Sequence, residues 1–298
     1  MQPIFSKSFI FSSLVVSAAT FGFQAWALRQ PNRLPGAQVT VAGTAEKIGG
    51  ARRGWRVWEL SAPEPRFGGI SALAIDHEGL VALTDSGVVI RFTPPDRAQQ
   101  RVNFSLQDLP DGPGPAWRKS GRDSESLLKD PHGRGWWVGF ETYHSLWRYD
   151  ADFSHAVSHD WLAVDWRRNR GGEGLIAGGG GIWVLPESGG SAVAVGATSN
   201  LRDIPVGTSD ATRLADGRMV LLVRRITWRG FATELLVAGR GRKPSLRLRL
   251  PLGAFDNPEA VAAAPLAGGG TRLWIATDDN FRPWMRTLLI ALDLPPGA

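Results

Sequence analysis

The sequence predicts an all-β protein built as a β-propeller, and three observations support this prediction. Helical periodicity is scarce, and short apolar runs alternate with turns of Gly, Pro and Asp. A unit of two such runs joined by a turn recurs five times along the chain. The leading residues of the units lie 37 to 54 residues apart, which is the period typical of propeller blades. A β-sandwich remains the alternative, because counting strands does not separate the two architectures.

Residues 1–27 are expected to be a secretory signal peptide rather than part of the propeller. Lys7 is the only charged side chain there, and an apolar run follows it up to Ala25-Trp-Ala27. A basic start, an apolar middle and a small-x-small site are typical of cleavable signals. Cleavage would place the mature chain in the periplasm or the medium, and an uncleaved membrane anchor is the alternative. No later apolar run approaches the length of a membrane span.

Composition limits the chemistry of the chain. It has 298 residues, of which 43% are hydrophobic, and these can form a packed core. The absence of cysteine excludes disulfides, thiolate metal sites and a cysteine nucleophile. The net charge of +6 comes mostly from arginine, which suits a small anionic or phosphorylated partner. We expect a monomer without nucleic acid as a partner, because an exported protein rarely meets nucleic acid.

Residues 28–64 are expected to supply strands that complete the ring before a propeller domain over 65–298. Strand-like runs lie at 38–41 and 55–60, and the run at 287–292 near the C-terminus is expected to pair with them. Five units and these additional strands predict six blades, with five or seven as alternatives.

The two ends of each unit should meet, because an antiparallel hairpin returns to the side where it began. If the hairpins form the inner strands of blades, these end residues ring one mouth of a central channel. The expected pairs are Ser71 with Asp85, Glu125 with Glu141, Glu173 with Glu187, Asp210 with Arg224, and Glu259 with Asp278.

Ordered motifs over about residues 65–293 resemble the family called esterase-like activity of phytase, or phytase-like. They are Phe67-Gly-Gly-Ile-Ser71, Asp123-Ser-Glu-Ser-Leu127, Glu173-Gly-Leu-Ile176 and Asp278-Asp-Asn-Phe281. The resemblance implies a β-propeller with phosphoester or ester hydrolase activity. Ser126 and Ala260 replace glycines of the pattern. Arg224-Arg225 stands where Glu-Arg is expected, which puts one possible metal contact in doubt.

The recurring carboxylates predict a cation site, because like charges around one axis repel and a hard cation relieves that repulsion. The candidate metal ligands are Glu125, Glu141, Glu259, Asp278 and Asp279. The candidate catalytic residues are Glu173, Glu187 and His144, and the candidate phosphate ligands are Arg122, Arg170, Arg224 and Arg225. Each carboxylate could instead hold the fold by accepting backbone N–H groups.

These observations together predict an exported phosphoester or ester hydrolase that uses Ca²⁺. The bound cation would activate a water, and the arginines would bind the phosphate. The sequence has no G-x-S-x-G motif and no P-loop, so neither an α/β-hydrolase nucleophile nor a nucleotide cradle is indicated. The alternative is a non-catalytic propeller that binds a small ligand or a protein at its channel mouth.

Overall fold

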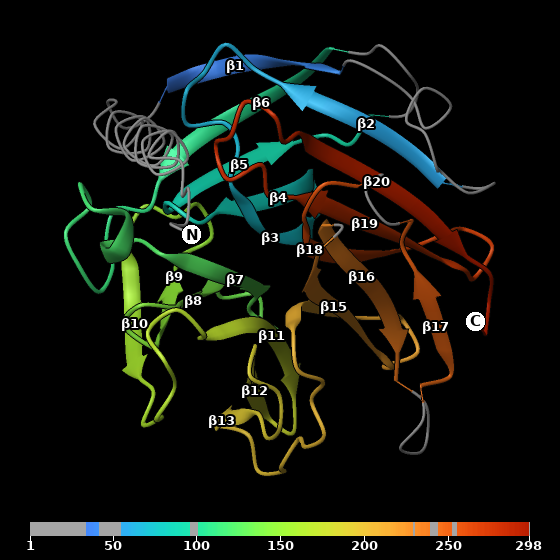
Figure 1. The fold of residues 1–298 in the computed structure, drawn as a ribbon. Helices are drawn as coiled ribbons and strands as arrows, with labels where there is room; N and C mark the ends of the chain where they lie inside the picture. Colours follow the sequence, from blue (N-terminus) through green and yellow to red (C-terminus); the bar gives the residue numbers. More distant parts are fainter. Residues whose placement is uncertain are drawn as a thin grey trace, which may run out of the picture.

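Short antiparallel sheets radiate from a central axis, as Figure 1 shows. The computed structural model describes residues 34–41, 55–95, 101–228, 230–238, 244–251 and 255–297. The described part is all-β apart from one short 3-10 helix, Lys119–Gly121. The predicted signal peptide, residues 1–27, lies outside the described residues. Among the described residues, no helix has the length and apolar character needed to cross a bilayer.

Five inner strands surround the axis and set the geometry of the mouth. Each contacts the next around a closed ring, and the last contacts the first. They are β3 (Ile70–Asp76), β7 (Ser124–Lys129), β11 (Gly172–Gly178), β14 (Thr208–Arg213) and β18 (Pro258–Pro265).

Outer strands complete each blade by antiparallel pairing. The first blade adds β4 (Gly79–Thr84), β5 (Val88–Phe92) and β6 (Arg101–Asp108), and the second adds β8 (Trp136–Phe140), β9 (Ser145–Tyr149) and β10 (Ala156–Trp161). The third adds only β12 (Gly181–Pro186) and β13 (Val193–Val195), and the fourth adds β15 (Met219–Thr227), β16 (Gly230–Val237) and β17 (Leu246–Arg249). The fifth adds β19 (Thr271–Thr277) and β20 (Thr287–Leu294).

The N-terminal strands close the ring. Strand β2 (Trp55–Ser61) pairs with β20 over residues 55–60, which confirms the pairing expected for the C-terminal run. Strand β1 (Leu34–Val41) pairs with both β2 and β6, so it joins the outer edges of the first and fifth blades. The prediction of six blades is wrong: β2 is the outer strand of the fifth blade, and the ring has five.

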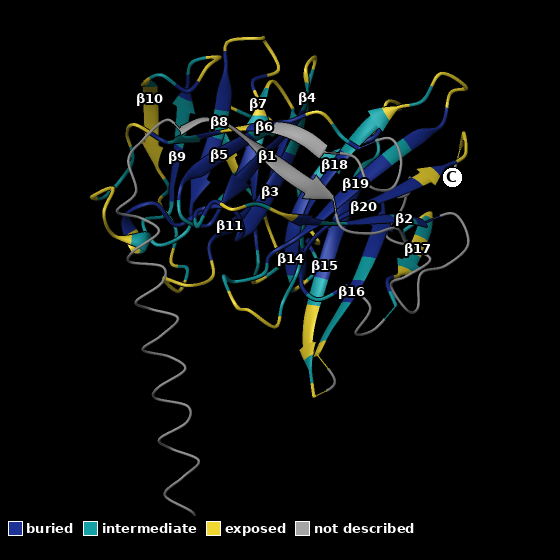
Figure 2. Cartoon of the chain, turned by 90° about the horizontal axis from the view of Figure 1, so that it is seen from above, coloured by how far each residue is buried: buried dark blue, intermediate teal, exposed yellow. Residues whose placement is uncertain are grey.

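The apolar core lies between the blades. Five clusters of buried side chains fill the spaces between neighbouring sheets. Tryptophans contribute large parts of them, for example Trp58 against Trp274 and Trp136 against Phe153. Figure 2 shows the inner strands buried, whereas the tip of the β15–β16 hairpin is exposed. Because every blade packs on two neighbours, the positions of the mouth residues depend on the whole ring.

Candidate functional site

A β-bulge recurs at one place in all five inner strands, near the end where each strand begins. In each blade the pairing register skips one residue there. Bulges bend a strand and re-aim the side chain of the unpaired residue. The skipped residues are Ser71, Glu125, Glu173, Ser209 and Glu259.

The two ends of each hairpin meet, as the sequence predicts. A residue that follows the second strand, or in the fourth unit lies within it, donates its N–H to the carbonyl just before the first strand, over 2.7 to 3.1 Å. The donor–acceptor pairs are Asp85 with Gly69, Glu141 with Asp123, Glu187 with Gly171, Arg224 with Gly207, and Asp278 with Asn257.

The register corrects one position of the fourth unit. Ser209, and not Asp210, occupies the bulge. Asp210 is buried, and its carboxylate accepts the N–H groups of Ala211 and Val261, each over 2.7 Å, as well as that of Leu73. Burial nevertheless raises the pKa of Asp210 well above its ordinary value. Asp210 therefore ties β14 to β18 and β3, and it is not a mouth residue.

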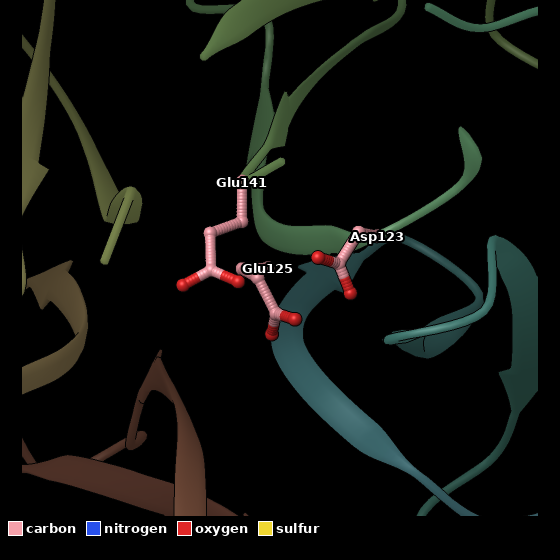
Figure 3. Close-up of side chains that lie close together, drawn as sticks. All are labelled: Asp123, Glu125 and Glu141. Carbon is pink, nitrogen blue, oxygen red and sulfur yellow. The ribbon is translucent and has the colours of Figure 1, made fainter. Parts of the chain in front are cut away.

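Three carboxylates gather where the second blade meets the mouth (Figure 3). Oxygen atoms of Asp123, Glu125 and Glu141 lie within 4.8 Å of one another. Asp123 precedes β7, Glu125 is the bulge residue of β7, and Glu141 follows β8. The hairpin therefore brings together residues that are up to 18 positions apart. We refer to these three residues as the carboxylate cluster.

Asp123 is held from two sides. Lys119 Nζ lies 2.6 Å from its Oδ1, and Thr142 Oγ1 donates to its Oδ2 over 2.6 Å. Lys119 also lies 3.2 Å from Asp85 Oδ2, so it bridges the first and second blades. Burial opposes the charge of Lys119, but Asp85 and Asp123 raise its pKa well above the ordinary value. Lys119 is therefore a fixed cation among the mouth acids.

Repulsion and burial raise the pKa of several mouth carboxyls. Burial, with repulsion from Asp123, raises the pKa of Glu141 to about 7. Burial and the charge of Glu173 raise the pKa of Glu125 well above its ordinary value. On β11, burial followed by the charges of Glu141 and Glu187 raises the pKa of Glu173. The predicted catalytic acids Glu173 and Glu187 therefore lie beside the cluster.

A second group of acids lies on the fifth-blade side. Burial, with repulsion from Asp85, raises the pKa of Asp278 to about 8. Burial also raises the pKa of Asp85. Asp279 is used differently: its Oδ1 accepts the N–H groups of Gly69 and Phe281, and its Oδ2 accepts the Thr287 hydroxyl. Its contacts make Asp279 a structural residue, although the sequence suggests a metal ligand.

Only some of the arginines that were predicted to bind phosphate are free to do so at the mouth. Arg224, which was expected to meet Asp210, is instead ion-paired with Glu259 and donates to Asn257 Oδ1 over 2.7 Å. Arg122 is buried and donates to the carbonyls of Gly114 and Gly121, so it holds the loop before β7. Arg170 is exposed, with its Nε 3.9 Å from Glu187 Oε2.

Two further predicted residues do not join the acids in the way expected. Arg225 is exposed and follows Arg224 in β15, so the alternation of the strand directs it to the other face. His144 has its Nε2 3.1 Å from the carbonyl oxygen of Trp166, and the two rings pack edge to face. This contact is that of a histidine that holds a loop.

The structure adds Asp123 and Lys119 to the site, and it gives Asp85, which was expected at the mouth but not as a candidate ligand, a place among the acids. Asp85 closes the first unit and Asp123 opens the second, so the repeat pattern contained a signal for both. Lys119 lies in the short 3-10 helix between β6 and β7, outside the repeated unit. Its role becomes visible only through its two ion pairs.

The carboxylate cluster could hold a metal ion. Its donors are oxygen atoms only, which favours a hard cation over a soft one. The raised pKa values of Glu125 and Glu141 indicate crowded negative charge that a cation would relieve. Asp123, Glu125 and Glu141 are the residues that would hold it.

The fold and the site define a five-bladed propeller with an acid-lined channel mouth. Within it, residues 65–204 match the model of the phytase-like family, described as esterase-like activity of phytase. This match confirms the predicted resemblance for that segment, which contains the whole carboxylate cluster together with Glu173 and Glu187. The motif at 278–281 lies outside the matched residues.

Solved structures that resemble this chain do so at low sequence identity and with TM-scores below 0.5. Hydrazine synthase of Kuenenia stuttgartiensis is 12% identical with a TM-score of 0.37, covering 75% of this chain and 62% of that one, under two thirds of its length. Aldose sugar dehydrogenase of Streptomyces coelicolor, with bound PQQ, is 11% identical with a TM-score of 0.47, covering 76% and 95%. Glutaminyl cyclase of Myxococcus xanthus is 10% identical with a TM-score of 0.49, covering 76% and 92%. A search of curated proteins gives no match.

Proposed function

We propose that this protein is an exported hydrolase of phosphoesters or related esters that uses a divalent cation, with Ca²⁺ as the first candidate. One observation carries the proposal: the convergence of Asp123, Glu125 and Glu141 in the mouth. The description of the matched family supports the ester class of substrate. Ca²⁺ accepts carboxylate oxygens in loose geometry, which suits ligands supplied by a loop, a bulge and a turn.

Each mouth residue has a task in this proposal. When bound, the cation withdraws electron density from the ester and makes an attacking water more acidic. Glu173, whose pKa is raised by burial and by the charges of Glu141 and Glu187, exchanges a proton with the water or the leaving group. Lys119 fixes Asp123, and exposed Arg170 offers contacts to an anionic substrate. The substrate is a small anionic ester, and the working unit is a monomer.

Calcium-dependent stability tests the cation site without relying on turnover. Thermal unfolding of the mature chain should shift upward with Ca²⁺, because a ligand bound only by the folded state stabilises it. Glu141→Gln removes one donor and should abolish most of the shift. Asp216→Asn is the matched control, because Asp216 is exposed in the turn between β14 and β15, away from the cluster. An equal shift in both variants would contradict the proposed ligand set.

Hydrolysis is tested separately with p-nitrophenyl phosphate and bis(p-nitrophenyl) phosphate. We expect turnover that EDTA abolishes and Ca²⁺ restores. Glu173→Gln should lose turnover, keep its folded structure and keep the calcium shift, because Glu173 transfers a proton and does not hold the cation. No turnover of either compound by a chain that Ca²⁺ stabilises would contradict the hydrolase.

A non-catalytic binding propeller is the second candidate, and one observation favours it. Of the predicted phosphate-binding arginines, Arg224 is tied to Glu259 and Arg122 to loop carbonyls. A mouth with few available arginines would bind a cationic or neutral ligand more readily than a phosphate. Calcium binding without turnover of the test esters is the result that this alternative predicts.

A further inference from the structure

A cavity of about 750 Å³ lies beside the mouth, in the size range of small-molecule sites. It is formed by the segment that follows β2 and by the loop between β19 and β20. Its walls include Phe67, Phe281, Trp284 and Met285, together with Leu60 at the end of β2. No part of the proposed reaction uses this cavity.

The aromatic wall is held in a strained backbone conformation. Asn280 and Phe281 both have φ of 50°, in the left-handed region that a bulky residue such as phenylalanine rarely adopts. Asp278 Oδ1 accepts the Asn280 N–H over 2.6 Å, and Asp279 Oδ1 accepts the Phe281 N–H over 3.0 Å. Strain of this kind concentrates at ligand sites, where the surrounding structure sustains it. Two acids therefore fix the wall of the cavity.

Only a glycine separates this wall from the acids of the mouth. A Cβ at Gly69 would lie 2.6 Å from Phe281 Cε2 and 2.8 Å from Asp85 Oδ1. Both distances are too short for any side chain, and Gly69 has φ of +60°. The Phe281 ring and the Asp85 carboxylate therefore both border the same small space at Gly69, so the cavity adjoins the mouth.

Asp85 leaves an acceptor at this junction. Its side chain is nearly enclosed, with 6% of the residue surface exposed. Its Oδ2 pairs with Lys119, whereas its Oδ1 is buried and has no hydrogen-bond partner within the described part of the chain. Buried polar atoms are nearly always paired, so an orphaned acceptor close to the Phe281 wall indicates a ligand or water that supplies a donor.

We propose that the cavity binds the aromatic group of an aryl ester whose ester group lies at the carboxylate cluster. The walls favour an aromatic ring, because offset and edge-to-face contacts with Phe and Trp add to the burial of apolar surface. Exposed Arg282 also lines the cavity, over the Trp284 ring at 5.9 Å, and its charge favours an anionic ligand near this entrance. The position of the ester group rests on the proposed function, whereas binding of the ring does not.

Binding of two stable phosphonates to the full mature chain tests the proposal. The probes are 1-naphthylphosphonate and methylphosphonate, whose carbon–phosphorus bonds are not hydrolysed, titrated by calorimetry with Ca²⁺ present. We expect the naphthyl probe to bind at least about tenfold more tightly. Trp284→Ala should reduce that preference to about threefold or less. The control is Trp228→Ala, another exposed tryptophan, at the β15–β16 turn, and it should keep the full preference.

The outcomes separate this proposal from the proposed function. A preference for the naphthyl probe that depends on Trp284 supports the aromatic subsite even if no ester is hydrolysed. Equal affinity of the two probes, no binding of the naphthyl probe, or the same loss in Trp284→Ala and Trp228→Ala would overturn it. Trp284 is exposed, so its replacement should leave the melting temperature unchanged, and that measurement shows that a loss of binding is not a loss of folding.

Discussion

At the scale of single residues, the mouth is a group of carboxyls that are largely buried and that outnumber the cations beside them. Lys119 neutralises part of the charge of Asp85 and Asp123, and Arg224 neutralises that of Glu259. The remaining carboxyls respond through raised pKa values, with Glu141 at about 7 and Asp278 at about 8. Near neutral pH such groups either keep a proton or require a bound cation.

Asp278 should make the folded chain less stable as pH rises. Its pKa rises from 3.8 in a model peptide to about 8 in the folded chain. The folded state therefore keeps a proton that the unfolded state loses, and stability falls as pH rises from about 4 to about 8. Asp278→Asn removes this term and keeps an oxygen that can accept the Asn280 N–H.

Thermal unfolding in EDTA measures this effect. Between about pH 5 and about pH 8 the wild type should lose stability relative to Asp278→Asn, by at least about 2–4 °C in melting temperature. Asp216→Asn serves again as the control and should follow the wild type at both pH values. Parallel pH profiles of wild type and Asp278→Asn would contradict the raised pKa.

At the scale of elements, two features arrange the mouth residues: a bulge in each inner strand, and the hydrogen bonds of Asp210 to neighbouring inner strands. The bulge recurs in every inner strand, and Asp210 links three of those strands. The sequence predicts Asp210 at the mouth because Asp210 aligns with the acidic residues that lead the other units. Ser209 is the unpaired residue of the bulge and takes the position at the mouth. The side chain of Asp210 therefore points into the protein interior.

Replacing Asp210 should therefore affect stability rather than ligand binding. Asp210→Ala leaves the buried N–H groups of Ala211 and Val261 without an acceptor, at a cost of about 1–3 kcal/mol in the free energy of unfolding. Ser209→Ala loses one bond to the Leu222 carbonyl and should cost about 1 kcal/mol or less. Urea unfolding measures both, and a smaller cost for Asp210→Ala than for Ser209→Ala would contradict this role.

At the scale of the whole molecule, the sequence was sufficient where interactions are local. Hairpin geometry brings Glu125 to Glu141 and Glu173 to Glu187, because each pair spans a single turn. The number of blades was not predictable in the same way. Whether residues 55–61 begin a new sheet or finish an old one depends on β20, at the other end of the chain.

The sequence also could not assign partners to long side chains. Arg122 and Arg224 were assigned to phosphate because arginine suits phosphate, yet both are occupied by groups of the chain itself. Lys119, the cation that does lie among the mouth acids, belongs to the 3-10 helix between β6 and β7, outside the repeated units. Electrostatic pairing is decided by three-dimensional packing, which a pattern of residue types does not contain.

Closure of the ring can be tested at Trp58 in β2. Its side chain is buried against Trp274 in the same blade. Trp58→Ala should lower the free energy of unfolding by about 3–5 kcal/mol. It should also weaken calcium binding, because a loosened closure lets the mouth acids move apart. Denaturant unfolding and calcium titration measure the two effects, with exposed Trp228→Ala as the control. If the variant is clearly destabilised but binds calcium as tightly as the wild type, the calcium site does not depend on closure of the ring.

Pairing of β2 with β20 has a mechanical consequence for such a crowded mouth. Repulsion among charged mouth acids opposes closure of the ring, and the pairing of β2 with β20 joins the two ends of the chain against it. A bound divalent ion would reduce this repulsion and so favour the closed ring. Metal-free protein should therefore exchange the amide hydrogens of β2 and β20 sooner than those of the strands far from the seam.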